Sequence, residues 1–537
     1  MRENLADLLV ETCRRFRSRT AIVRGETRIT FGELEERAAR LANFLRTQGV
    51  GEGDRVGIAV RNSPEYVETL LAAMWVAALP VNVNYKYKAE ELFHVLEDAS
   101  VRALVHDQAV GQSLATAGRR LPGLEVMIAA LDGGPTTSCG VAARYEEAIR
   151  EPRIAVDPSR VEGEWLLYTG GTTGLPKGVL SKHGDLIKVL GRRAFDYLGA
   201  PHPTDRAEFL TLLDELGRDT EPHVVNLVAP PAMHATGTYA TLGTLLTGGT
   251  VVYLSTDSYD PADMAQLITQ WRVTHLTFVG DAFARPLVDE LRRAEAEGTP
   301  HDLSSLRCVH SVGAAWSSSS KAELLEFCDP EIEDVLASTE TGRYAAMVTR
   351  RSGTEVRTVL EPIVELRVID DSGADVIPGS GAVGMIAVPV STTVNYSRAS
   401  EGSTTFRVID SQRYCIPGDL AVVNKDGTLE LRGRSNRAIN TGGEKVFAEE
   451  VEAVLLDHRQ VRDTLVLDRP DARWGRAVVA LVVTEQGDLP PSEADLRAYV
   501  SSRLANYKSP KQIRFVPEIP RNANGKFDLR WASSLQW

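Results

Sequence analysis

The first part of the chain alternates between two hydrophobic patterns. Apolar residues recur at helical spacing over 31–48 and 89–98, whereas residues 55–60 and 103–106 form short, nearly continuous apolar runs. The first pattern predicts amphipathic helices and the second predicts buried strands. Because this alternation is typical of parallel sheets covered by helices, we expect an α/β fold from Ala6 to about Leu429.

The pattern changes after Pro362 to short β-rich runs separated by turn residues. Residues 363–369, 384–390 and 429–432 are the clearest of these runs. Strands at such close spacing predict a small β subdomain that completes the large domain.

The residues beyond Arg434 have an α+β pattern of their own. About a hundred residues suffice for an independently folded domain. We therefore predict a large domain over 1–434, a boundary at 435–437 and a small domain over 438–537. The elements expected in the small domain are helices at 448–457 and 492–504 and strands at 461–467, 478–484 and 512–516.

Three further segments have patterns that predict where they lie in the fold. Residues 1–16 read as a surface helix, because charges interrupt their leucines. Residues 70–83 are apolar but contain Pro80 and are too short for a bilayer, so they predict a buried helix that runs into a strand. The polar residues 201–222 look like a surface insertion.

Composition narrows the class of protein. With 537 residues, 43% hydrophobic and 25% charged, the chain is typical of a soluble multidomain enzyme. A formal charge of −13 makes nucleic acid an unfavourable partner. The five cysteines form no C-x-x-C pair, which suits a reducing cytoplasm better than a disulfide framework.

One glycine- and threonine-rich run carries the clearest chemistry. It extends from Tyr168 to Val179 after an apolar strand at 165–168, and it contains Lys177. Backbone N–H groups and hydroxyls in such a turn can converge on a phosphate, and Lys177 adds a positive charge. Pro176 precedes the lysine, so this is not a P-loop; the alternative is a surface loop of small polar residues. The cradle residues are Thr169, Gly170, Gly171, Thr172, Thr173, Gly174 and Lys177.

This run resembles the phosphate loop of the adenylate-forming superfamily, which includes acyl-CoA synthetases, firefly luciferase and peptide-synthetase adenylation domains. Further motifs follow in the family's order, so the resemblance covers nearly the whole chain. They are Ser338-Thr-Glu-Thr-Gly342, Tyr414-Cys-Ile-Pro-Gly-Asp419, Gly433-Arg434, Asn440-Thr-Gly-Gly-Glu-Lys445 and Pro520-Arg-Asn-Ala-Asn-Gly-Lys526. Residues 82–85, 280–286 and 440–447 look most like bacterial fatty-acyl-CoA or steroid-acyl-CoA ligases.

The resemblance implies roles for particular residues. Glu340 is expected to hold magnesium, Asp419 to bind the ribose hydroxyls and Lys526 to bind the reacting carboxylate and the oxyanions at the α-phosphorus. The resemblance also implies that the large domain over 1–434 binds ATP and the acyl group, that 435–437 form a hinge with Asn436 as its pivot, and that the small domain over 438–537 is mobile. The other residues expected to contact the nucleotide or CoA are Gly313, Ala314, Ala315, Ser338, Thr339, Arg434, Asn440, Gly442, Gly443 and Lys445.

His234 follows the turn at Pro230-Pro-Ala-Met and resembles the gate residue beside the acyl carboxylate. A buried structural histidine is a serious alternative for so short a motif. Taken alone, Asp419, Glu340 and Lys526 would each be ordinary surface residues, and only their order along the chain favours the functional reading.

The chain also departs from the family pattern. Leu336-Ala337 replaces the aromatic residue and glycine that begin the acidic motif, Asn395-Tyr396 replaces Gly-Tyr, Gly384-Met385 replaces Gly-Glu, and Ala448 replaces a proline. The changes at Leu336, Asn395 and Ala448 keep open an adenylating enzyme with a non-CoA acceptor, namely an amine, a carrier-protein thiol, or nitrite as in diazotising relatives. A second alternative is a non-catalytic binding protein, and the joint presence of Lys177, Glu340, Asp419, Arg434 and Lys526 speaks against it.

The expected function is therefore ATP-dependent activation of a carboxylic acid to its acyl-AMP with release of pyrophosphate, followed by transfer to coenzyme A. The resemblance implies ATP, Mg²⁺ and coenzyme A as ligands and a small-molecule carboxylic acid as substrate. We expect a cytoplasmic enzyme without integral membrane contact. The sequence leaves open the acid, and whether the chain forms a homodimer.

Overall fold

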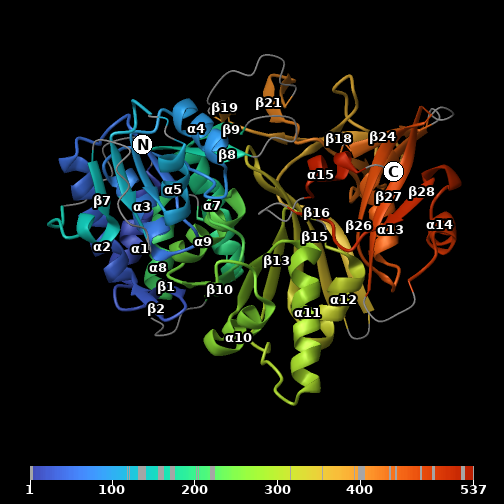
Figure 1. The fold of residues 1–537 in the computed structure, drawn as a ribbon, viewed down its shortest axis with the longest axis horizontal. Helices are drawn as coiled ribbons and strands as arrows, with labels where there is room; N and C mark the ends of the chain where they lie inside the picture. The colour runs from blue at the N-terminus through green and yellow to red at the C-terminus, as the bar shows by residue number, and fades with distance from the viewer. Residues whose placement is uncertain are drawn as a thin grey trace. The chain divides into compact units, whose positions relative to one another are not determined.

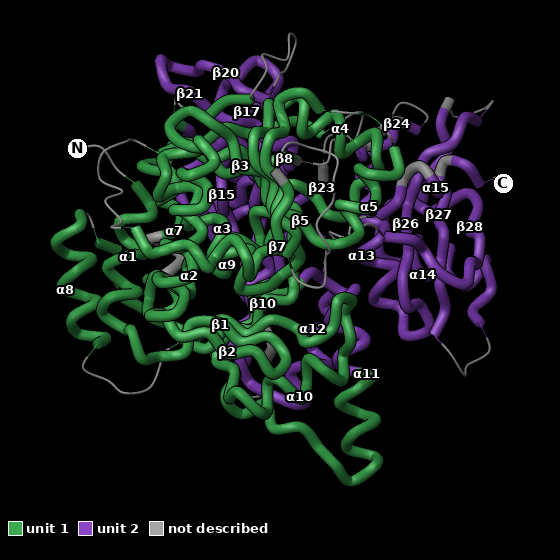
Figure 2. The backbone as a smooth tube through the Cα atoms, turned by 60° about the vertical axis from the view of Figure 1, so that its left-hand side comes forward, with its two compact units in different colours: residues 1–278, 289–310, 391–401 green, residues 279–288, 311–390, 402–537 purple. Residues whose placement is uncertain are grey.

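The computed structural model describes most of the chain and divides it into two compact units (Figures 1 and 2). Unit 1 comprises Met1–Phe278, Asp289–His310 and Ser391–Glu401, and unit 2 comprises Val279–Val288, Ser311–Val390 and Gly402–Trp537. The described residues are 4–117, 119, 121–130, 141–154, 163–169, 176–200, 202–203, 205–217, 224–314, 316–352, 355–391, 394–396, 405–434, 437–441, 444–471, 475–485, 490–521 and 527–535.

Unit 1 contains two largely parallel sheets. The first has the order β2-β1-β11-β10-β12-β13, in which only the β1–β2 pair among those with a described register is antiparallel. Its strands are β1 (Thr20–Arg24), β2 (Thr27–Thr30), β10 (Val225–Val228), β11 (Thr250–Tyr253), β12 (His275–Phe278) and β13 (Cys308–Val312), the last of which crosses the boundary between the units.

The second sheet of unit 1 has the order β19-β9-β8-β4-β3-β5-β6-β7. It is parallel from β8 to β7 and antiparallel at β8–β9 and β9–β19. Its strands are β3 (Arg55–Ala59), β4 (Leu79–Asn82), β5 (Ala103–His106), β6 (Val126–Ala129), β7 (Val141–Arg144), β8 (Glu164–Thr169), β9 (Lys177–Lys182) and β19 (Asn395–Tyr396).

Helices of unit 1 bury their apolar faces against these sheets. One large core cluster takes residues from α1, α2, α3, α7 and α9, and a second takes residues from α4 and α5. The helices are α1 (Leu5–Arg15), α2 (Phe31–Thr47), α3 (Pro64–Trp75), α4 (Ala89–Asp98), α5 (Gln108–Thr116), α6 (Tyr145–Ala148), α7 (His183–Leu198), α8 (Arg206–Leu216), α9 (Ala235–Leu246), α10 (Pro261–Trp271) and α11 (Gly280–Ala296), which begins in unit 2.

The β-rich part of unit 2 is antiparallel wherever its register is described. Its strands follow the order β14-β15-β16-β23-β22-β18-β21-β20, and β17 pairs with β18. They are β14 (Glu331–Ser338), β15 (Gly342–Ser352), β16 (Glu355–Pro362), β17 (Arg367–Ile369), β18 (Val383–Pro389), β20 (Phe406–Ile409), β21 (Gln412–Cys415), β22 (Asp419–Val423) and β23 (Leu429–Arg434), with α12 at Ser318–Phe327.

The C-terminal part of unit 2 has its own core. A hairpin precedes helix α13, which packs on a three-stranded sheet of order β26-β27-β28, and Val446, Val451, Val478 and Leu496 are buried together. The elements are β24 (Ala438–Thr441), β25 (Glu444–Phe447), α13 (Ala448–Leu456), β26 (Val461–Asp471), β27 (Gly475–Thr484), α14 (Glu493–Ser501), a 3₁₀ turn at Asn506–Lys508, β28 (Gln512–Phe515) and α15 (Leu529–Ser534).

The mixed α/β fold predicted from the sequence is confirmed, with two local corrections. Helix α1 is not a surface helix, because Leu5, Leu9 and Cys13 are each at most 2% exposed and belong to the core. The stretch 201–222 contains helix α8, whose Phe209 and Leu213 pack into the same core. The spacing of these apolar residues was concealed by the surrounding polar ones.

His183 is the first residue of α7 and directly follows β9. It connects the start of α7 to the N-terminal helix by a hydrogen bond. Its imidazole Nδ1 accepts a hydrogen bond from the Leu5 backbone N–H at 3.2 Å. The ring fills the space beside Gly163, where a Cβ would lie 2.0 Å from it. Burial lowers the pKa of His183 to about 4, because the charged imidazolium would be desolvated.

This burial makes stability depend on pH. The unfolded histidine has a pKa near 6.5, so below that value the unfolded chain binds the proton more tightly than the folded chain. The contribution is complete above pH 6.5 and is lost as the pH falls towards 4. We expect the His183 component to lower the free energy of unfolding by ~2 kcal/mol between pH 7.5 and pH 5.

Denaturant unfolding of wild type and His183→Gln at both pH values measures this component as the difference between the two pH dependences. His202→Gln is the control, because His202 is exposed and lies 2.9 Å from Asp196. A pH dependence in His183→Gln as steep as in wild type would contradict the assignment.

Candidate adenylation site

The predicted phosphate loop lies between two paired strands. Thr169 at the end of β8 is the antiparallel partner of Lys177 at the start of β9. Helix α4 holds both ends of the loop: Tyr168 donates its hydroxyl to Asp98 at 2.5 Å, and His94 donates from Nε2 to the Pro176 carbonyl at 3.2 Å. The strand pairing and these two bonds fix the base from which the loop projects.

Lys177 begins β9 with an exposed side chain. Its ammonium lies 5.6 Å from the centre of the Tyr396 ring, and Tyr396 is the partner of Val179 in the β9–β19 pair. A cation over an aromatic face is held without being neutralised. Tyr396 therefore helps to orient the Lys177 side chain. The departure at Asn395-Tyr396 thus keeps the tyrosine where it contacts the lysine.

His234 is the N-cap residue of α9, at the end of a tight turn. Its backbone N–H donates to the Pro231 carbonyl at 3.1 Å. Gly237 allows the turn to approach the helix, since a Cβ there would lie 2.4 Å from the Pro231 carbonyl oxygen. Backbone contacts within the turn thus contribute to the position of His234.

Two asparagines that the sequence did not single out as functional hold this turn. Asn82 on β4, 1% exposed, donates from Nδ2 to the Ala232 carbonyl at 3.2 Å and the Met233 carbonyl at 3.3 Å, and its Oδ1 accepts from Trp165 Nε1 at 3.0 Å. Asn62 accepts from the Ala232 N–H at 2.6 Å. A buried amide inside an apolar strand is the signal that could have identified Asn82.

In unit 2 the acidic motif is the loop of a β-hairpin. Ser338 at the end of β14 pairs with Gly342 at the start of β15, whose φ is 68°. The Ser338 hydroxyl lies 2.9 Å from the Thr341 hydroxyl and accepts from the Thr341 N–H at 3.2 Å. Thr339 and Glu340 occupy the tip and are half-buried. The tip therefore offers a carboxylate on a rigid turn.

The ribose motif lies beside the acidic motif. Asp419, 3% exposed, begins β22 and pairs across the strands with Arg434 on β23. Its Oδ2 accepts a short hydrogen bond from the Tyr344 hydroxyl of β15. Burial, and then the charge of Glu340, raise the pKa of Cys415, so Glu340 lies near this motif. The structure thus places Glu340 near the motif that contains Asp419, whose backbone pairs with that of Arg434, and Tyr344 is a neighbour that sequence reasoning missed.

Some expected site residues are described only in part. Gly313 follows β13 with φ 102° and is exposed, and Ala314 is half-buried. Asn440 and Lys445 are cross-strand partners in the β24–β25 hairpin. The side chains of Thr169, Arg434, Asn440 and Lys445 lie outside the described residues, as do Gly170, Gly171, Thr172, Thr173, Gly174, Ala315, Asn436, Gly442, Gly443 and Lys526 entirely.

The flanks of the Lys526 loop are described even though the lysine is not. Arg521 and Phe527 form an antiparallel bridge that closes the loop, and the guanidinium of Arg521 lies 3.9 Å from the Phe527 ring centre. Arg521 also donates to Asp463 on β26 at 2.7 Å. The loop is therefore anchored to the C-terminal sheet.

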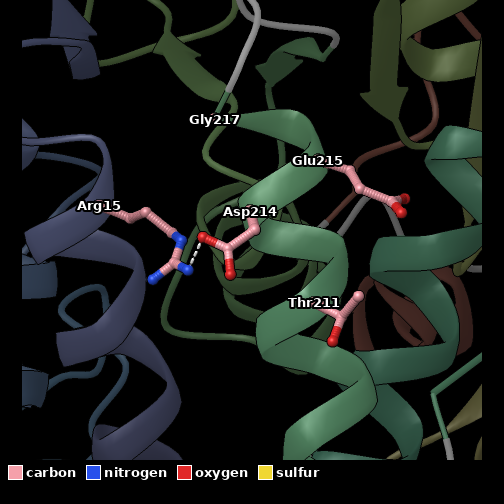
Figure 3. A pocket seen from close by; sticks show the side chains of 5 residues that line it. All are labelled: Arg15, Thr211, Asp214, Glu215 and Gly217. Atoms are coloured by element: carbon pink, nitrogen blue, oxygen red, sulfur yellow. Dashed lines mark ion pairs between the residues drawn. The ribbon is translucent and has the colours of Figure 1, made fainter.

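A surface hollow of about 460 Å³ lies elsewhere in unit 1, beside α1 and α8 (Figure 3). It contains an ion pair between Arg15 and Asp214, and no predicted site residue lines it. The hollow lined by Arg15, Thr211, Asp214, Glu215 and Gly217 is therefore not the candidate site.

Known proteins match this chain along nearly its whole length. Residues 9–391 match the family model "AMP-binding enzyme", and residues 450–526 match "AMP-binding enzyme C-terminal domain". A medium/long-chain-fatty-acid–CoA/3-oxocholest-4-en-26-oate–CoA ligase of Mycolicibacterium smegmatis is 36% identical over 99% of this chain and 96% of its own length. A 3-oxocholest-4-en-26-oate–CoA ligase of Rhodococcus rhodochrous is 34% identical over 98% of this chain and 95% of its own.

The fold matches solved structures as well. An anthranilate CoA ligase, AuaEII, solved with anthranoyl-AMP, superposes with a TM-score of 0.81 at 23% identity and covers 99% of this chain and 97% of its own. The fold and the motifs together define an adenylate-forming enzyme. The chain belongs to the AMP-binding enzyme family. The predicted enzyme class, an AMP-forming acid–thiol ligase, is confirmed. In the part of the chain that the structure describes, every helix is too short or too polar to cross a bilayer.

The contacts of Asn82 generate a test of the turn before His234. In Asn82→Asp a carboxylate replaces the amide that donates to two backbone carbonyls, so both carbonyls lose a donor and face a buried anion. We expect a loss of ~3 kcal/mol in the free energy of unfolding and reduced activity. Asn84→Asp is the matched control, because Asn84 accepts from the Lys86 N–H at 2.9 Å and aspartate can do the same. Equal stability of both variants, measured by thermal denaturation, would refute this role.

Proposed function

We propose that this enzyme activates a carboxylic acid with ATP to an acyl-AMP, releases pyrophosphate, and transfers the acyl group to coenzyme A. The observation that carries the proposal is the proximity of Glu340 to the motif of Asp419 in unit 2. A buried aspartate held by a tyrosine hydroxyl suits a ribose, and a glutamate at a hairpin tip suits a metal-bound phosphate.

In the proposed first step a carboxylate oxygen of the acid attacks the α-phosphorus and the bond to pyrophosphate breaks. The loop 169–177 would bind the departing pyrophosphate, because its glycine- and threonine-rich sequence supplies N–H groups and Lys177 a positive charge, and both of its ends are fixed. Lys526 would neutralise the oxyanions that develop at the α-phosphorus. Asp419, oriented by Tyr344, would fix the ribose.

The residues around Glu340 fit a magnesium ion. Mg²⁺ prefers hard oxygen ligands and few protein carboxylates. The hairpin tip offers the carboxylate of Glu340 together with the hydroxyls of Ser338 and Thr341. When bound, the ion would neutralise charge on the phosphates of ATP. Glu340 is the residue proposed to hold it.

For the acid we propose a medium- or long-chain fatty acid or the carboxylated side chain of a steroid, and for the acceptor the thiol of coenzyme A. The names of the two CoA ligases described above, each of which matches more than nine-tenths of this chain, support both choices. They favour coenzyme A over an amine, a carrier-protein thiol or nitrite. His234 would lie beside the acid's carboxylate, because the turn held by Asn62 and Asn82 presents it at the start of α9.

We further propose that residues 438–537 rearrange between the two steps and exchange Lys526 for the hairpin of Asn440 and Lys445, with Asn436 as pivot. Separate family models for 9–391 and 450–526 support a division of the chain in this region. Arg437 donates to Glu452 at 2.6 Å and to the Val466 carbonyl at 2.9 Å, so it belongs to the C-terminal part. The pivot would accordingly precede Arg437.

A pyrophosphate-release screen tests the function directly. Fatty, steroid, aromatic and amino acids are offered with ATP and Mg²⁺, with and without coenzyme A, and acyl-AMP and acyl-CoA are quantified. We expect turnover with fatty or steroid acids, and acyl-AMP that accumulates only without coenzyme A. Acyl-AMP that persists when coenzyme A is present would favour the non-CoA acceptor.

The role of Lys526 can be separated from binding. In Lys526→Ala we expect acyl-AMP formation to fall by about 10²–10³-fold, because a charge placed at the developing oxyanions is lost. Conversion of supplied acyl-AMP to acyl-CoA should stay within severalfold of wild type. Single-turnover assays of each step measure both rates, and equal losses in the two steps would disprove the exchange of loops.

Glu340→Gln tests the metal site. The amide keeps the shape of the side chain but removes one anionic ligand of a hard cation, so we expect about tenfold more Mg²⁺ to be needed for half-maximal adenylation. Glu361→Gln is the control, because Glu361 lies on a neighbouring strand with a half-exposed side chain 3.4 Å from Arg350. If the magnesium dependence of Glu340→Gln equals that of the control, the metal ligand lies elsewhere.

A further inference from the structure

Arg285 is a largely buried cation that connects α11 and α12 with the C-terminal part of unit 2. Its side chain is 13% exposed. One terminal nitrogen lies 3.4 Å from both the Val461 carbonyl and a Glu485 carboxylate oxygen. The other lies 3.4 Å from the Leu456 carbonyl and 3.3 Å from the Ser317 hydroxyl. The guanidinium thus donates to three acceptors between residues 456 and 485, and to the Ser317 hydroxyl at the start of α12.

The contact at Leu456 places the positive charge of Arg285 at the C-terminal end of helix α13. Leu456 is the last residue of α13, and the terminal carbonyls of a helix carry partial negative charge without an intrahelical donor. Arg285 donates to this carbonyl, and Ser319 on α12 donates to it from its hydroxyl at 3.5 Å. The C-terminal end of α13 is therefore capped by side chains more than a hundred residues away in sequence.

Carboxylates approach this contact from both sides. Asp281 lies 3.5 Å from Arg285 on α11. After burial, the charge of Asp281 contributes to a raised pKa at both Asp457 and Asp463, whereas Arg503 and Arg285 lower the pKa of Asp457 and Arg521 lowers that of Asp463. Removing Arg285 would leave like charges facing each other.

The geometry suits a contact that forms and breaks. Each distance from the Arg285 guanidinium to an oxygen of the C-terminal residues is 3.4 Å, longer than the roughly 2.9 Å of a strong N–H···O bond. The contact therefore consists of several weak hydrogen bonds. The other side is preorganised, because Asp281 accepts from the backbone N–H and the hydroxyl of Ser317 at 3.1 Å each. Arg285 would keep Asp281 and Ser317 as partners if the C-terminal residues moved away.

We propose that Arg285 is a positioning residue, a latch that holds residues 448–485 in one of the two arrangements required by the two half-reactions. It sets the balance between adenylation and thioester formation without touching the reacting atoms. This inference rests on the proposed function, because only an enzyme with two such steps needs the balance.

The test compares Arg285→Ala and Arg285→Lys with Arg293→Ala in the full-length enzyme. Arg293 lies on the same helix but pairs only with Glu290 and Glu297 of α11 among the partners described, so its loss controls for removal of a helix charge. Adenylation and conversion of supplied acyl-AMP are measured separately. We expect Arg285→Ala to change the ratio of the two rates by about tenfold, equivalent to ~1.4 kcal/mol, by slowing one step and sparing or accelerating the other. Arg285→Lys should lie between, because lysine keeps the charge and loses the fork.

Hydrogen–deuterium exchange of the ligand-free protein provides a readout that does not depend on activity. We expect faster exchange at residues 456–461 in Arg285→Ala and no change in Arg293→Ala. An unchanged rate ratio, or a parallel fall of both rates with reduced thermal stability, would overturn the latch. Unchanged exchange would overturn it as well. Absence of pyrophosphate release by wild type would instead refute the proposed function, and the exchange data would still decide whether Arg285 holds the segment.

Discussion

The candidate site depends on keeping one ionisable side chain, Asp419, away from water. A buried carboxylate is costly unless a neighbour compensates it, and here the Tyr344 hydroxyl donates to it. Tyr344 on β15 and Asp419 on β22 belong to the same antiparallel sheet. The sheet must therefore form in one register before Asp419 is tolerable, because a one-residue slip would turn Tyr344 to the other face. The same register brings the Glu340 hairpin next to this aspartate, so the packing of unit 2 and the chemistry of the site have a common origin.

Local hydrophobic periodicity predicted several elements with nearly the observed bounds. Helix α4 at Ala89–Asp98 and strand β5 at Ala103–His106 have the predicted bounds, and α2, β3, β8, α13 and β28 differ by one or two residues. The errors occurred where tertiary packing decides. Residues 206–216 look polar in sequence, yet Phe209 and Leu213 find a place in a core built by α1 and α7, which no local pattern can reveal. Residues 363–369 were expected as one strand, but β16 ends at Pro362 and β17 begins only at Arg367.

The functional motifs were visible in sequence for a different reason than their supports. Lys177, Glu340 and Asp419 stand in runs of glycine, threonine and proline, whose backbone requirements are unusual enough to be recognised. Their supports are ordinary residues in ordinary strands and helices: Asp98 and His94 hold the phosphate loop, Asn82 holds the turn before His234, and Tyr344 holds Asp419. Each acts over a large sequence separation through a single polar atom. To predict such contacts, one must know which strands are neighbours. The spacing of residues along the chain does not contain that information.

The residues on both sides of the predicted pivot are held in place by contacts, although the pivot itself would have to rotate. Before it, Gly433 has φ 103° and leaves space for Glu449 of α13, whose carboxylate a Cβ would approach to 2.5 Å. After it, Arg437 is fixed by Glu452 and the Val466 carbonyl. Glu452 is itself buried and also accepts from the Val466 N–H at 2.7 Å, so the arginine belongs to a network that would move as one body. If the C-terminal residues rearrange, the rotation must then be confined to the two residues between Arg434 and Arg437, and the Glu449 side chain must leave Gly433. Glycine at position 433 lets α13 make this contact in one arrangement. A larger residue at that position would prevent α13 from approaching.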